Sequence, residues 1–196
     1  MKLEKRDCGV KIELEPGSFL GVDFDIYGDK FSFNPASTMG GQFGNFLSAL
    51  YSLYAMEEWP CEHHTRDDGS HIIEAVSTGL DWDNEGDVML IRMKKYFDYM
   101  GEISEKISLK ISTDYGKTFK KFSVYHKDLC YAVAKACTEV LKEYGVFGYR
   151  YSTEYDDLKL HQLLYIKAVA LDAFEIIADK EKTSFEKEME LLLFDM

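Results

Sequence analysis

The stretch of sequence that decides the fold is FSVYHKDLCYAVAKACTEVLKEYGVFGYRY, residues 122–151. From Leu129 onward its apolar residues fall at i, i+3, i+4, i+7, i+8, i+11 and i+15, which is one stripe of an amphipathic helix. Asp128 stands where an N-cap or first-turn carboxylate belongs, and Gly145 stands where a left-handed C-cap belongs. The pattern predicts a short strand, a helix over 129–144, and then an aromatic run.

Alternating residues before this helix predict two strand meanders, and helical spacing on both sides of it predicts further helices. The expected strands cover residues 9–15, 20–26, 31–33, 71–77, 88–97, 107–111 and 119–124. The expected helices cover 43–54 and about 153–177, the latter capped by Ser152 or Thr153, with a terminal helix capped by Thr183. The sequence therefore predicts an α+β fold in which antiparallel β meanders pack against two long helices, with a C-terminal helical extension.

Length and composition favour one domain. The chain has 196 residues, of which 46% are hydrophobic, and it contains only three prolines and no flexible linker. That is enough for one sizeable core. We expect a single α+β domain over 1–196, with a β-rich body at about 1–127 and a helical part at about 128–196.

The charge of the chain bears on its partners. The formal net charge is −12 and the isoelectric point is near 4.9. This average field would repel a phosphate backbone or an anionic membrane surface, so it argues against nucleic-acid binding. It favours a basic protein partner, and the alternative interpretation, which weighs more, is that the acidity keeps the protein in solution.

The expected location is the cytoplasm. The charged N-terminal segment lacks the apolar core of a signal peptide, and no run reaches the length of a membrane span. The cysteines Cys8, Cys61, Cys130 and Cys137 are scattered, which favours reduced thiols.

A polar segment after residue 60 has the residue types of a zinc site. The candidate ligands are Cys61, His63, His64 and His71, with Asp67 and Asp68 nearby. Their number suits Zn²⁺, but the segment has neither a paired C-x-x-C nor an H-E-x-x-H. A solvated surface loop is the alternative interpretation.

An acidic segment follows between two expected strands. Asp81-x-Asp83-x-Glu85-Gly86 resembles the first half of an EF-hand loop, but the twelfth position, which must supply a carboxylate, is Arg92. Strands rather than helices flank the segment, so an EF-hand is excluded and either an irregular Ca²⁺ site or an acidic inter-strand loop remains. Trp82, surrounded by Asp81, Asp83, Glu85 and Asp87, would provide a contact for a basic partner.

Two further motifs are too incomplete to assign an activity. Residues 112–119, STDYGKTF, resemble the Asp-box of sialidases and related β-propellers, in which the box is a structural turn; one copy predicts a hairpin only. Cys130 near His126 could form a thiolate at a helix start, but no oxyanion donor or orienting carboxylate accompanies it. We therefore assign no catalytic residue and expect no cofactor.

The order of elements resembles the small immunity proteins of bacterial polymorphic-toxin systems, including the family that neutralises the wall-associated nuclease toxin. The segments that carry the resemblance are GNFLSALYSLY (44–54), EAVSTG (74–79), DVMLIRMKKYF (87–97), ISLKIS (107–112) and the helix from Asp128. Residues beyond Tyr144 depart from it. The resemblance implies a toxin-neutralising inhibitor and transfers no functional residues.

Three functions follow as hypotheses. The first is a non-enzymatic, acidic, cytosolic binding module of the immunity type. The second is a metal-dependent or small-ligand-binding enzyme that uses Cys61, His63, His64 and His71. The third is an oligomeric structural protein with the terminal helices at its interface.

Overall fold

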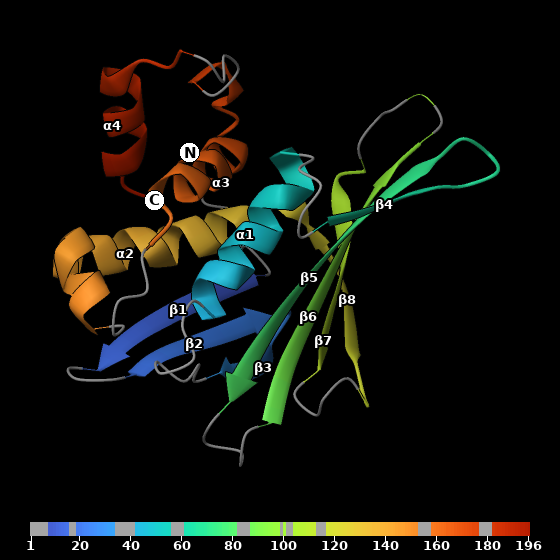
Figure 1. The fold of residues 1–196 in the computed structure, drawn as a ribbon, viewed down its shortest axis with the longest axis horizontal. Helices are drawn as coiled ribbons and strands as arrows, with labels where there is room; N and C mark the ends of the chain where they lie inside the picture. The colour runs from blue at the N-terminus through green and yellow to red at the C-terminus, as the bar shows by residue number, and fades with distance from the viewer. Residues whose placement is uncertain are drawn as a thin grey trace.

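A computed structural model describes residues 8–15, 19–33, 42–55, 61–81, 87–98, 100, 104–112, 117–152, 158–176 and 182–196. It contains two antiparallel sheets and four α-helices, which confirms the α+β fold. Figure 1 shows α2 along the three-stranded sheet and α1 beside the five-stranded sheet, with α3 and α4 on the side of α2 away from β1 and β2. Within the described residues, no helix is long and apolar enough to cross a membrane.

The first sheet is the expected N-terminal meander, with strand order β1-β2-β3. Its strands are β1 (Cys8–Glu15), β2 (Phe19–Ile26) and β3 (Asp29–Phe33). Tyr27 and Gly28 both have positive φ, at 54° and 88°. This is the backbone twist that a two-residue hairpin turn requires. The Gly28 N–H also donates to Oδ1 of Asp25 at 3.0 Å, which fixes the turn.

The second sheet has the order β4-β5-β6-β7-β8. Its strands are β4 (Cys61–Thr65), β5 (His71–Asp81), β6 (Asp87–Phe97), β7 (Lys106–Ser112) and β8 (Lys120–Tyr125). Four of them match predicted strands, but β4 does not. The alternative reading of residues 61–65 as a surface loop is wrong, because this polar segment pairs with β5 as an edge strand.

The two sheets meet along β3 and β8. The rings of Phe31 and Phe122 pack edge to face with their centroids 5.7 Å apart. The Tyr27 hydroxyl donates to the backbone oxygen of Ser123 at 2.7 Å. The two sheets therefore contact each other at this corner, and their inner faces share one apolar core with α1 and α2.

Helix α1 (Gln42–Ala55) lies over β5, and helix α2 (His126–Ser152) lies over β1. The deciding helix therefore begins three residues before Leu129 and continues past Gly145. Gly145 is non-helical, with φ 68° and ψ 176°, and it separates the predicted helix from a second helical segment. The expected aromatic run is thus helical, with Tyr149 buried and Phe147 89% exposed.

The last two helices differ from expectation at their caps. Helix α3 (Leu160–Leu171) has Lys159 at its N-cap, and Ser152 belongs to α2, so the prediction of Ser152 as a cap is wrong. Thr153 lies outside the described residues. Helix α4 (Phe185–Leu193) is capped by Ser184, one residue after Thr183. A short 3-10 helix, Phe174–Ile176, follows α3.

Lysines hold the C-terminal segment against α2 and α3. The buried ammonium group of Lys167 donates to the backbone oxygens of Leu192 at 2.9 Å and Phe194 at 2.8 Å. Lys135 donates to the backbone oxygen of Met196 at 2.8 Å, and Lys142 lies 2.6 Å from Asp195. Cations at these carbonyls also suit the negative end of the α4 dipole.

Candidate interaction surface on the five-stranded sheet

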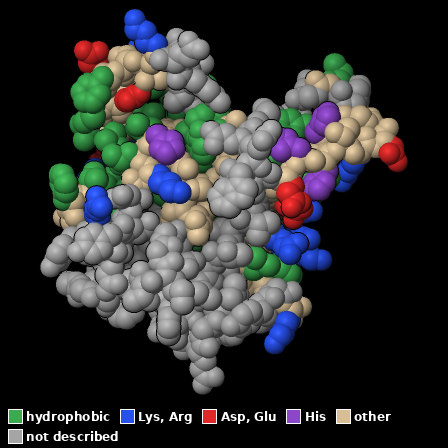
Figure 2. Space-filling model, viewed as in Figure 1, with side chains coloured by type: hydrophobic (Ala, Val, Ile, Leu, Met, Phe, Trp, Pro, Cys, Tyr) green, Lys and Arg blue, Asp and Glu red, His purple; other side chains and the backbone are tan. Residues whose placement is uncertain are grey.

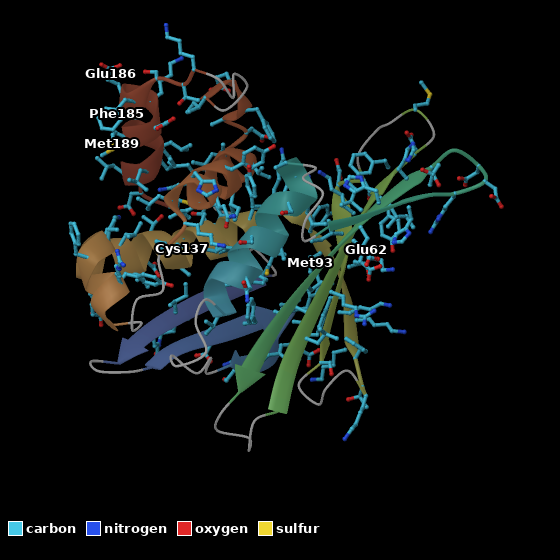
Figure 3. All side chains as sticks on the ribbon, in the orientation of Figure 1. Glu62, Met93, Cys137, Phe185, Glu186 and Met189 are labelled. Carbon is cyan, nitrogen blue, oxygen red and sulfur yellow. The ribbon has the colours of Figure 1, made fainter. Side chains whose placement is uncertain are left out.

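The five-stranded sheet has two chemically different faces because side chains alternate along each strand. The inner face carries the buried residues Met93, Leu109 and Val124, which pack against the helices. The outer face carries the residues between them, which are mostly charged or hydroxylated. Figure 3 labels Met93 and Glu62 on opposite sides of this sheet.

Three cations face one another across the outer face of β6, β7 and β8. Arg92 pairs in register with Lys110, and Lys110 pairs in register with Lys121. We call these three residues the cationic row. Directly opposed residues of antiparallel strands lie about 5 Å apart at Cβ, so the row places three positive charges across about 10 Å of sheet. Arg92 and Lys121 are exposed, and Lys110 is half-buried.

The cationic row has no counter-charge within the described part of the chain. None of its members forms an ion pair with a described residue. The Arg92 guanidinium instead lies over the ring of Phe119, 5.7 Å from the centroid. Figure 2 shows lysine and arginine side chains gathered on the side of the molecule where this sheet lies.

A second row of the same face crosses all five strands. It runs in register through Glu62, Glu74, Lys94, Ser108 and Ser123. Lys94 is neutralised by Glu74, with 2.6 Å between its ammonium nitrogen and Oε2. The second row lies next to the cationic row along the strands, and its two carboxylates, Glu62 and Glu74, stand on β4 and β5.

Folding alone does not explain the cationic row. Like charges directly opposite each other on a sheet are destabilising, whereas opposite charges there contribute roughly 0.2–1 kcal/mol per pair. The row contains two such like-charge pairs in a protein that carries 35 acidic residues and 23 basic ones. A surface that keeps an unfavourable arrangement of this kind is a candidate for a binding function.

Two residues of the predicted acidic contact, Asp81 and Asp87, stand where strand β5 ends and strand β6 begins. They form the last register pair of the β5–β6 ladder. Trp82, Asp83 and Glu85 lie outside the described residues. The contact with a basic partner stays a prediction.

The predicted metal ligands lie on β4 and at the start of β5. His63 and His64 are consecutive in a strand, so they point to opposite faces, and His64 lies 3.4 Å from Glu62. His71 contacts the Thr65 hydroxyl at 3.1 Å, and Cys61 is in register with Ala75. Across the described residues, no group of three or more His, Cys, Asp and Glu could hold a metal ion.

The suggested nucleophile Cys130 is buried together with other polar groups. Burial raises its pKa to about 12, which is the opposite of what an activated thiolate at a helix start requires. Lys95, which is 2% exposed, points inward from β6, donates to the backbone oxygen of Leu53 at 3.4 Å, and lies 4.3 Å from the Tyr54 ring centroid. His126 stacks on the same Tyr54 ring at 5.6 Å.

Burial dominates the electrostatics of this inner cluster. It lowers the pKa of Lys95 to about 8 and raises that of Tyr54. Burial and the neighbouring charge of Lys95 both lower the pKa of His126. Nδ1 of His126 has no hydrogen-bond partner among the described residues. Because Tyr54, Lys95 and Cys130 are all buried, a substrate cannot reach the thiol in this conformation.

The outer face of the three-stranded sheet carries a shallow hollow of about 340 Å³. It lies around Gly9, which is paired with Asp25. Charged residues of both signs line it: the basic Lys11 and Lys30, and the acidic Asp23 and Asp25. Such alternation gives no preference for a ligand of either charge.

Comparisons with protein-family models, with curated proteins and with solved structures found no match to this chain.

Proposed function

We propose that this chain is a non-enzymatic protein-binding module and that the outer face of the five-stranded sheet is its contact surface. The observation that carries the proposal is the cationic row, in which Arg92, Lys110 and Lys121 stand in register and have no ion pair with a described residue. The arrangement costs folding free energy and would be repaid by an oppositely charged partner.

The row is suited to binding because its side chains start from a rigid base. All three residues lie within hydrogen-bonded strands, and the ring of Phe119 supports the guanidinium of Arg92. Sites on strands are positioned more accurately than sites on loops, and a supported arginine loses less conformational entropy on binding.

The proposal can be tested by mapping amide shifts of the isotope-labelled protein by nuclear magnetic resonance. Poly-L-glutamate and heparin serve as two chemically different anionic probes at low salt. Each should perturb the amides of β6, β7 and β8 around Lys110, and the effect should vanish when Arg92, Lys110 and Lys121 are all changed to Gln. Perturbations that map to another surface, or that survive the triple change, would refute this contact surface.

A toxin-neutralising role is a narrower form of the proposal, in which a second contact binds a basic toxin domain. The supporting observation is that the last register pair of the β5–β6 ladder joins two acidic positions of the chain, Asp81 and Asp87. Charge reversal at Asp83 and Glu85 should then slow association with a basic nuclease-toxin domain at low salt, measured by surface plasmon resonance. An unchanged association rate would remove this end of the hairpin from the proposal.

A further inference from the structure

We infer that the cationic row binds an acidic helix of a protein partner, laid across strands β6, β7 and β8. The inference rests on the proposed binding function and specifies the chemistry of the partner. Three features support it: the spacing of the row, the chemistry of its groups, and the charges at its borders.

The spacing of the row matches that of a helix face. Neighbouring strands lie about 4.8 Å apart, so successive cations of the row are separated by about one strand spacing. Carboxylates at positions i, i+4 and i+8 of a helix follow one side of it in a slowly turning line, with about 5–6 Å between neighbouring Cβ atoms. An acidic helix that crosses the strands can therefore bring one carboxylate to each of Arg92, Lys110 and Lys121.

The groups of the row and its neighbours favour carboxylates. The planar guanidinium of Arg92 can donate two parallel hydrogen bonds to one carboxylate, and Phe119 already restrains its orientation. The lysines supply point charges. In the adjacent row, the hydroxyls of Ser108 and Ser123 flank the lysines on the same face and can donate to further oxygens of the helix.

The borders of the row disfavour a long phosphate polymer. On one side lie Glu62 and Glu74 of the adjacent row, the second of them paired with Lys94. A nucleic acid that extended past the row toward β4 would meet the carboxylate of Glu62, and the chain as a whole carries a net charge of −12. A helix presents a short acidic stripe and can leave its other faces neutral.

The experiment compares two fluorescently labelled probes by anisotropy. One is an alanine-rich helical peptide of about 20 residues with Glu at i, i+4 and i+8, long enough to be helical in water. The other is a single-stranded 20-nucleotide DNA. We expect the helical peptide to bind at least about tenfold more tightly than the DNA at low salt, as three exposed ion pairs would allow.

Two sets of variants assign the binding to the row. Changing Arg92, Lys110 and Lys121 to Gln should weaken peptide binding about tenfold. Changing Lys11, Lys30 and Lys187 to Gln removes the same charge elsewhere and should leave binding unchanged. A third variant, Glu62→Gln, should strengthen DNA binding and leave peptide binding unaltered, because it removes a carboxylate from the border of the row.

The outcomes separate the inference from the function on which it rests. DNA binding as tight as peptide binding, lost in the Arg92–Lys110–Lys121 variant and with a salt slope near −2, would overturn the acidic helix but keep the contact surface. A peptide with the same Glu residues scattered around the helix that bound equally well would also overturn the helix geometry. If neither probe distinguished the two triple variants, both the inference and the contact surface would fail.

Discussion

Replacing the central lysine of the cationic row should make the protein more stable. In Lys110→Glu, the side chain that faces Arg92 on one side and Lys121 on the other changes sign. Two repulsive cross-strand pairs become two attractive ones, while the strand keeps a long, polar, half-buried side chain. Lys and Glu have similar strand propensities, so the change isolates the charge.

The size of the effect follows from the pair energies. Exposed ion pairs are worth about 0.2–1 kcal/mol each, and like-charge pairs cost similar amounts. With values near the lower end for each of the two pairs, the change from repulsion to attraction amounts to about 1 kcal/mol. In a chain of 196 residues, that corresponds to a rise in Tm of about 2–4 °C.

The assay is thermal and urea unfolding at about 0.01 M and about 1 M salt, where the Debye length falls from about 30 Å to about 3 Å. The matched control is Lys117→Glu, which alters the net charge equally at an exposed lysine outside the ladder that has no ion pair with a described residue. The stabilisation of Lys110→Glu over the control should be present at low salt and largely lost at high salt.

Two results would refute this reasoning. If Lys110→Glu unfolded at or below the temperature of Lys117→Glu at low salt, the register pairs would not be repulsive. If the difference between the variants persisted at high salt, its origin would not be electrostatic. The cationic row would then be an ordinary solvated surface and would lose its value as a sign of function.

The other predictions concern buried lysines and one glycine. Lys95→Met should raise stability by about 2 kcal/mol at pH 7, because the folded protein holds a proton on an amine whose pKa burial lowers from 10.5 to about 8. This gain should shrink by about 1 kcal/mol at pH 9, because between about pH 8 and 10.5 only the unfolded chain still holds the proton, and the cost of giving it up on folding falls as the pH rises. Lys167→Met should make amide exchange in α4 roughly tenfold to a hundredfold faster, because two backbone oxygens lose a charged donor. Gly145→Ala should destabilise by about 1–3 kcal/mol, because φ 68° with ψ 176° is a region that glycine alone occupies readily.

Each of these changes has a control within the chain. Lys95→Met serves as the control for Lys167→Met, because it should not alter amide exchange in α4. If Lys95→Met increased the exchange rate in α4 as much as Lys167→Met does, the cause would be a general loss of stability. A gain for Lys95→Met that did not vary with pH would contradict a titrating ammonium group. Gly148→Ala places a Cβ 3.2 Å from that of Tyr144 within a helical segment, and it should cost less than Gly145→Ala. If the two alanine variants lost the same free energy of unfolding, side-chain packing rather than backbone conformation would explain the loss at Gly145.

The sequence predicted the fold well where periodicity is strong. The alternation of Val10 and Ile12 and the helical stripe from Leu129 each specify one buried face, and both elements form as expected. It failed at β4, because Cys61–Thr65 is polar on both faces and pairs at a sheet edge, where burial imposes no pattern. The Asp-Gly pair at 68–69 was the missed signal for the β4–β5 turn.

The candidate surface could be predicted only in part. Alternation in β6 and β7 places Arg92, Lys94 and Lys110 on the polar faces of their strands. It does not say that Arg92 stands opposite Lys110 rather than Ser108, because a ladder's register depends on loop lengths and turn geometry. The net charge also failed to predict the sign of this surface, because a total of −12 is compatible with one face on which cations stand side by side.

Strand β6 shows that the fold accepts unfavourable charge on both of its faces. Its inner face buries Lys95 against the end of α1, and its outer face contributes Arg92 to the cationic row. The inner cation can be explained by structure, since it caps the Leu53 carbonyl and stacks on Tyr54. In the outer row Arg92 lies over the ring of Phe119, but the two lysines have no ion pair with a described residue. Repulsion within the row costs about 0.5 kcal/mol, half of the change expected on reversing its central charge, against the 5–15 kcal/mol that stabilises a domain. An external anion that pairs with all three side chains would turn that cost into binding free energy.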